Sequence, residues 1–124
     1  MTLAILCGLR SGTKDAEEVL RHYLDWLKHR PPDVGNLTRN ALTLASQEEG
    51  QRAGMLAWAG SGMDNAGNGG LMRVAGVYLA GLIGAELTDM AVRVTALTHA
   101  DPRCLLASVF MVKLLEQLEH FKVA

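Results

Sequence analysis

Apolar residues recur at the spacing of an α-helix along most of this chain. Over residues 15–30 they fall on one face of a helix with about 3.6 residues per turn. The residues on that face are Val19, Leu20, Tyr23, Leu24 and Leu27. Asp15 and Glu18 have the spacing of a capping box at its start, and Pro31 and Pro32 end it. No segment alternates apolar and polar residues over the length of a strand, so the sequence predicts an all-α fold.

Local signals predict further helices. Asn36 is a candidate N-cap for a helix that continues through Leu44. Residues 71–87 are mostly apolar and predict one core helix despite three internal glycines. Asp101 followed by Pro102 predicts the start of the last helix, because an acidic cap and a proline at the first helical position both favour initiation. We therefore expect a compact, orthogonal packing of helices in a single domain over residues 1–124.

Charge and composition exclude two classes of protein. The chain of 124 residues has 12 Lys and Arg against 13 Asp and Glu, which gives a net charge of −1. A nucleic-acid binder with a broad basic face does not fit this balance, and 5% aromatic residues are too few for base stacking. The segment 71–87 contains Arg73 and Glu86, so we expect no membrane span.

Two cysteines bear on the cellular compartment. Cys7 and Cys104 both lie in apolar stretches, which indicates buried thiols in a reducing compartment rather than a disulfide scaffold. No targeting segment stands out at the start of the chain. The expected location is the cytoplasm.

Residues 61–70 interrupt the helical pattern with four glycines, two asparagines and an aspartate. A glycine-rich turn that leads into a helix can present free backbone N–H groups to a phosphate. Asp64, Asn65 and Asn68 could hydrogen-bond ribose hydroxyls, and Arg73 could bind an anion one turn into the helix. The alternative is a connector whose glycines only allow close helix packing. The P-loop and dinucleotide patterns are both absent from the sequence.

His99 lies in the connector before the last helix and also has two interpretations. Its ring nitrogens could contact a ligand, or they could satisfy backbone groups between two helices. Asp101 is better explained as an N-cap than as a catalytic acid. No paired carboxylates, metal-ligand spacing or Ser-His-Asp grouping is evident in the sequence, so the catalytic residues stay unknown.

Three blocks, in this order, resemble the ADP-ribosylglycohydrolase family. Residues 23–26 and 31–38 are similar to its W…PPDIGNTT stretch, and residues 66–75 (AGNGGLMRVA) to its GNGxLMRxAP signature, with Gly76 in place of the usual proline. The third block is TALTH at residues 95–99, followed by DPR at 101–103. The resemblance implies an all-α fold and hydrolysis of the glycosidic bond between ADP-ribose and a protein side chain.

The resemblance also implies which residues border the ligand. ADP-ribose, free or on a protein, is the implied partner. Asn68, Gly69 and Gly70 would border it, with Asp64 and Asn65 beside them, and His99 would lie on the same pocket wall. The candidate ligand-binding residues are Asp64, Asn65, Gly67, Asn68, Gly69, Gly70, Arg73 and His99.

The family's two metal motifs do not occur in this sequence. Family members use two divalent metals, usually magnesium or manganese, which are held by a Thr-Asp-Asp-Thr run and an Asp-x-Asp-Thr run. We therefore expect a partial family domain without a cofactor of its own, in which hydrolysis is weak or absent. The alternative is a helical interaction module that forms a homodimer or higher oligomer through exposed apolar faces. The candidate faces are Leu3, Ile5, Leu6 and Leu9 in the first helix and Val109, Phe110, Leu114 and Leu118 in the last.

Overall fold

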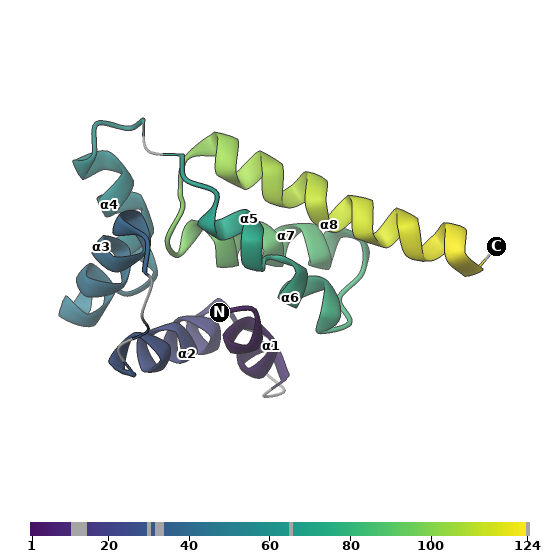
Figure 1. The fold of residues 1–124 in the computed structure, drawn as a ribbon, viewed down its shortest axis with the longest axis horizontal. Helices are drawn as coiled ribbons and strands as arrows, with labels where there is room; N and C mark the ends of the chain where they lie inside the picture. The colour runs from purple at the N-terminus through teal and green to yellow at the C-terminus, as the bar shows by residue number, and fades with distance from the viewer. Residues whose placement is uncertain (11–14, 30, 32–33, 65, 124) are drawn as a thin grey trace.

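The computed structural model describes residues 1–10, 15–29, 31, 34–64 and 66–123. All regular secondary structure within these ranges is helical, which confirms the predicted all-α class (Figure 1). None of the helices in this part of the chain is both long and apolar enough to cross a membrane.

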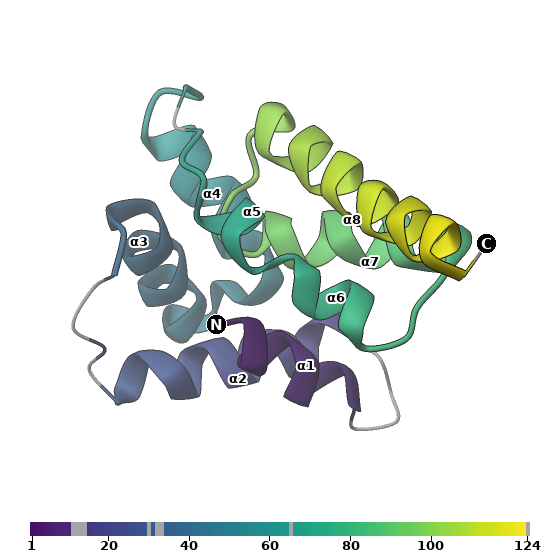
Figure 2. The ribbon, with the colours of Figure 1, turned by 45° about the vertical axis from the view of Figure 1, so that its right-hand side comes forward.

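The first two helices pack against each other. Helix α1 (Thr2–Arg10) lies beside α2 (Ala16–Lys28), and α1 also contacts α6 (Figure 2). Asp15 caps α2 as predicted, because its carboxylate accepts a hydrogen bond from the backbone N–H of Glu17 at 3.2 Å. Glu18 pairs instead with Arg21 at 2.8 Å. Helix α2 ends before Pro31, as expected, whereas Pro32 lies outside the described residues.

The next helices form one side of the molecule in Figure 1. They are α3 (Asn36–Leu44), a π-helical turn η1 (Ala45–Glu49), a short 3-10 turn η2 (Gly50–Arg52) and α4 (Ala53–Gly60). The prediction that Asn36 is an N-cap was wrong. The extended Gly35 precedes the helix, Asn36 is its first residue, and no side chain caps it.

The predicted single helix over 71–87 is also wrong. The segment forms α5 (Gly69–Arg73), α6 (Ala75–Leu79) and the start of α7 (Gly84–Ala96). Gly81 and Gly84 have φ angles of 93° and 60°, which a continuing right-handed helix does not allow. The chain therefore reverses direction between α6 and α7.

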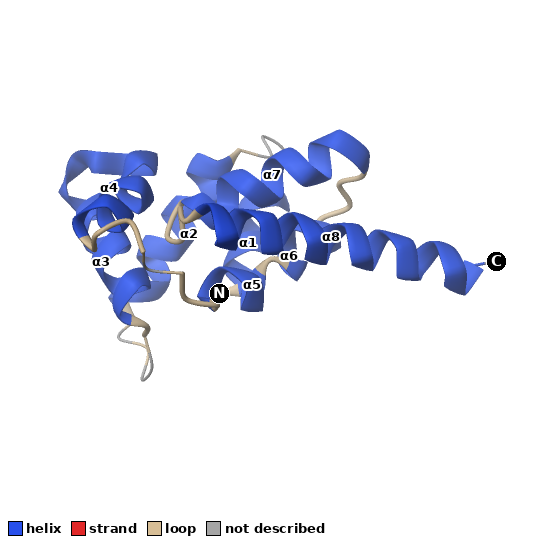
Figure 3. Cartoon of the chain, turned by 90° about the horizontal axis from the view of Figure 1, so that it is seen from above, coloured by secondary structure: helices blue, strands red, loops and turns tan. Residues whose placement is uncertain are grey.

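Helix α8 (Pro102–Val123) packs along α7 and extends past the rest of the molecule (Figure 3). It begins as predicted, because the Asp101 carboxylate accepts the backbone N–H of Arg103 at 2.9 Å. The main core lies between α1, α2, α3, α6, α7 and α8. Its largest fully buried side chains include Ile5, Leu9, Val19, Tyr23, Leu42, Val74, Val77, Leu87, Val94, Leu97 and Val112.

Two expectations about exposure need correction. Cys104 is buried, as predicted, but Cys7 is exposed, and both thiols are free. In the first helix Ile5 and Leu9 belong to the core rather than to an open face, because α2 and α6 cover them. Of the four α1 residues in the predicted apolar face, Leu3 is the one that stays largely exposed, at 73%.

Candidate functional site

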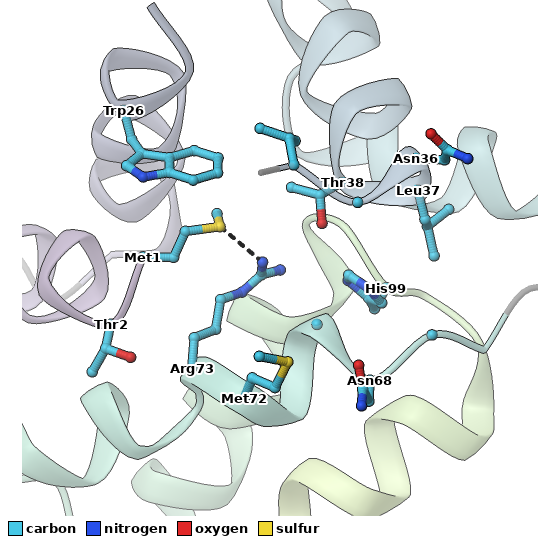
Figure 4. A pocket seen from close by; sticks show the side chains of 14 residues that line it. Met1, Thr2, Trp26, Asn36, Leu37, Thr38, Asn68, Met72, Arg73 and His99 are labelled. Carbon is cyan, nitrogen blue, oxygen red and sulfur yellow. Dashed lines mark hydrogen bonds between the residues drawn. The ribbon is translucent and has the colours of Figure 1, made fainter. Parts of the chain in front are cut away.

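A cavity of about 660 Å³ opens where the start of α1, the end of α2 and the start of α3 face α5 (Figure 4). His99, in the connector between α7 and α8, also lines the cavity. The residues that line the cavity are Met1, Thr2, Trp26, Val34, Gly35, Asn36, Leu37, Thr38, Gly67, Asn68, Gly69, Met72, Arg73 and His99.

Most of the predicted ligand-binding residues meet in this pocket. Gly67, Asn68, Gly69, Arg73 and His99 all line it, although they come from two separate parts of the sequence. The structure therefore brings the glycine loop and the histidine connector together.

Two predicted residues, Gly70 and Asp64, do not line the pocket in this structure. Gly70 is buried beneath it, against Thr95 and His99. Asp64 is exposed, and its carboxylate binds the guanidinium of Arg103 at 3.0 Å. Asn65 lies outside the described residues.

Sequence reasoning missed Trp26, Asn36 and Thr38 as lining residues. Each belongs to the first block that resembles the family, over residues 23–26 and 31–38. The signal was therefore present in the sequence, but a helical or turn pattern does not show which side chains face a ligand.

The two glycines that begin α5 permit a close approach of neighbouring side chains. A Cβ at Gly69 would lie 2.9 Å from His99 Cε1, and one at Gly70 would lie 2.8 Å from Thr95 Cγ2. Both distances are too short for carbon atoms in contact. The geometry thus supports the packing interpretation for these glycines. Gly69 also lines the pocket, so at this position packing and binding are compatible.

The helix dipole contributes less than the sequence suggested. Helix α5 contains five residues and gives way to α6 after Val74. A short helix aligns few peptide dipoles, so side chains must supply most of the polarity of this pocket.

Arg73 is the charged side chain at the floor of the pocket. It is 4% exposed, and its guanidinium carbon lies 4.8 Å from the centre of the Tyr23 ring. One Nη donates to Thr98 Oγ1, the other lies 3.1 Å from the Met1 sulfur, and Nε has no partner among the described residues. The contact with Tyr23 contributes about 0.5–2 kcal/mol, whereas a buried charge without a counter-ion costs several kcal/mol.

Burial and Arg73 alter the titration of the two neighbouring rings. Burial raises the pKa of Tyr23 to about 12, and its hydroxyl has no hydrogen-bond partner within the described part of the chain. Burial, with a smaller effect of the Arg73 charge, lowers the pKa of His99 to about 4. His99 is therefore neutral near pH 7.

Thr98 links Arg73 and His99. Arg73 can only donate, so Thr98 Oγ1 accepts from it, and the same oxygen lies 2.7 Å from His99 Nδ1, where either atom can donate according to the tautomer of the ring. In a neutral imidazole that accepts at Nδ1, the proton is on Nε2. Nε2 faces Gly67 and Gly69, because a Cβ at these positions would lie 3.7 and 3.0 Å from it. In that tautomer the ring can donate a hydrogen bond at the glycine loop.

The loop before α5 is fastened to the start of α8. Arg103 binds Asp101 at 2.9 Å and Asp64 at 3.0 Å, and Trp58 donates to Asp101 at 2.9 Å. The Arg103 hydrogen bonds hold the pKa of Asp101 well below its usual value. The Cys104 thiol adds a contact of 3.3 Å to the Gly67 carbonyl. Asp101 therefore acts as a helix cap, as predicted, and as an anchor of the loop.

The described residues offer no evident metal centre. They contain no group of three or more His, Cys, Asp and Glu side chains that could hold a metal ion. The described lining of the pocket includes no carboxylate, and its charged member is the cation Arg73.

Comparison with known proteins gives one match. The family model described as ADP-ribosylglycohydrolase matches residues 1–120 of the chain. No curated protein and no solved structure matches it. The matched range includes the three blocks that form the pocket, and the fold is all-α as the resemblance implied. The chain belongs to the ADP-ribosylglycohydrolase family.

Proposed function

We propose that this chain binds ADP-ribose, free or attached to a protein, in the pocket between α2, α3 and α5. The observation that carries the proposal is the convergence of all three family-like blocks on one cavity. Thr38 comes from the first block, Asn68 from the second and His99 from the third. The volume of about 660 Å³ falls within the range of about 300–1,000 Å³ that is common for small-molecule sites.

The pocket offers chemical groups that complement each part of ADP-ribose. The Trp26 indole provides an apolar surface for a base or a sugar face. The exposed amides of Asn36 and Asn68 can donate to and accept from ribose hydroxyls. Arg73 provides positive charge for a diphosphate. These groups support a ligand that is part apolar, part hydroxylated and part anionic.

We propose in addition that hydrolysis by this chain alone is weak or absent. The family reaction uses two divalent metals, magnesium or manganese, held by carboxylates and hydroxyls. The residues of the described pocket do not fit such a pair, since they contribute a guanidinium and no carboxylate. We derive no hydrolytic step for this chain.

Isothermal titration tests binding and metal dependence together. ADP-ribose is titrated into the chain with and without magnesium, and an ADP-ribosylated protein is incubated with the chain under the same two conditions. We expect heat of binding in both titrations and no release of ADP-ribose. The absence of heat in both titrations would refute the binding proposal. Metal-dependent release of ADP-ribose would refute the proposal that hydrolysis by this chain is weak or absent.

The alternative, an interaction module, is favoured by a separate observation on α8. Four apolar side chains at intervals of four residues are exposed on this helix: Leu106 at 72%, Phe110 at 68%, Leu114 at 40% and Leu118 at 55%. Spacing of this kind places the four side chains along one side of the helix. We call this set of four residues the α8 stripe. We propose that the α8 stripe pairs with a second copy of the chain.

The cytoplasmic location stays a prediction from the sequence.

A further inference from the structure

The guanidinium of Arg73 is placed where a ligand can reach it. Figure 4 shows it rising from α5 into the space between Met1, Trp26, Thr38 and His99. Arg73 is otherwise almost fully buried, with 4% of the residue exposed. The small exposed part of Arg73 therefore faces the pocket.

Arg73 lacks a counter-ion in the described parts of the chain. None of the ion pairs there involves it, and Arg103, Arg93 and Arg21 take the carboxylates that pair with arginines. Thr98 and the Met1 sulfur each occupy one donor, and a thioether is a weak acceptor. A guanidinium has five N–H donors, so the remaining Nη hydrogens are left for a ligand, whereas Nε–H is fully buried.

The surroundings hold the guanidinium in place without neutralising it. The Tyr23 ring packs against it at 4.8 Å, and Thr98 binds one Nη. Neither group carries a negative charge near pH 7, because Tyr23 keeps its proton and Thr98 is neutral. An arginine that is fixed, buried and unpaired is suited to planar, bidentate binding of an oxyanion.

We propose that Arg73 forms an oxyanion subsite at the floor of the pocket, where it binds a phosphate or carboxylate group of the ligand. The inference deepens the proposed function and rests on it for the identity of the whole ligand, in which the oxyanion is the diphosphate. The same chemistry could serve a carboxylate, and the two sources are separated by experiment.

Nuclear magnetic resonance of the arginine Nε–H groups tests the subsite in the wild-type chain. The Arg73 signal is identified by its loss in Arg73→Lys. Sodium pyrophosphate, sodium acetate and adenosine are then added in turn at matched ionic strength. We expect pyrophosphate to shift the Arg73 Nε–H signal, because an oxyanion bound at the Nη groups changes the electronic environment of the whole guanidinium, and adenosine to leave it in place. A larger shift with acetate assigns the subsite to carboxylates. No shift with either oxyanion overturns the proposal.

A pair of variants tests the same subsite through stability and affinity. Arg73→Met removes the buried cation, and Arg93→Met removes an exposed cation on α7 that pairs with Asp89. Pyrophosphate should raise the Tm of the wild type and of Arg93→Met, but not of Arg73→Met. ADP-ribose should bind Arg73→Met at least about tenfold more weakly, as expected for a lost charged hydrogen bond. If Arg73→Met does not fold, the NMR titration of the wild-type chain decides whether Arg73 binds the oxyanion.

The outcomes distinguish this inference from the proposed function. Unchanged ADP-ribose affinity in folded Arg73→Met would overturn the oxyanion subsite and leave ADP-ribose binding intact. A pyrophosphate response at Arg73 without any ADP-ribose binding would support the subsite and refute ADP-ribose as the ligand.

Discussion

Gly69 and His99 show how a single missing methyl group shapes the pocket. A Cβ at Gly69 would lie 2.9 Å from His99 Cε1, so Gly69→Ala must displace the imidazole or the start of α5. We expect this variant to lower the free energy of unfolding by about 1–3 kcal/mol, the usual cost of overpacking. Urea denaturation measures the change.

Gly60→Ala is the matched control for that experiment. Gly60 ends α4, and nothing lies within 4 Å of the position that its Cβ would take. Alanine should be neutral there or stabilise by up to about 1 kcal/mol through its higher helix propensity. Equal effects of the two substitutions would contradict the close approach of His99 to α5.

The buried imidazole of His99 should make stability depend on pH. Its pKa is about 4 in the folded chain and about 6.5 for an exposed imidazole, so the unfolded chain binds more protons between these values. Stability from this group is complete above about pH 6.5 and is lost as the pH falls towards 4. Between about pH 7 and pH 4.5, the wild type should lose about 2 kcal/mol more than His99→Gln.

Urea denaturation of both chains at the two pH values measures that difference. We compare the loss of unfolding free energy between the two pH values in the two chains. This comparison removes the contribution of carboxylates, which both chains share, and any constant cost of the substitution. Parallel losses in the wild type and in His99→Gln would show that the imidazole of His99 titrates normally and is not buried as described.

At the scale of elements, the α8 stripe predicts self-association. The wild type should form a dimer in light scattering at micromolar concentration, because the stripe exposes four apolar side chains along one face of α8. Phe110→Glu should shift the chain to a monomer, since a carboxylate in an apolar interface is not solvated. Leu79→Glu is the control, because Leu79 is similarly exposed, at 65%, but lies on α6.

The outcome for the wild type is decisive for this alternative. A monomer at every concentration would remove the support for the interaction module. A dimer that Phe110→Glu leaves intact would place the interface elsewhere on the molecule.

The elements that could be predicted from the sequence are those fixed by neighbours in the chain. Helix α2 and the start of α8 have local caps, Asp15 and Asp101, and both formed where expected. The break between α6 and α7 within 71–87 depends on the positive φ angles of Gly81 and Gly84. Glycine permits that backbone conformation but does not require it, so the apolar pattern alone predicted a continuous helix.

At the scale of the whole molecule, the site depends on contacts between distant segments. The family-like blocks predicted that the glycine loop and His99 share a pocket, and the fold brings them together. The partner of Asp64 could not be predicted, because Arg103 is 39 residues away and meets it through the tertiary packing of α8. That Arg73 has no counter-ion among the described residues is likewise a property of the folded chain, which no local pattern reveals.

A crystal structure of the chain with ADP-ribose tests the central claim most directly. The account predicts density for the ligand in the cavity of about 660 Å³, in contact with Thr38, Asn68 and His99 together. Density at another place on the molecule, or an empty cavity at saturating ligand in a crystal form that leaves its mouth open, would contradict it.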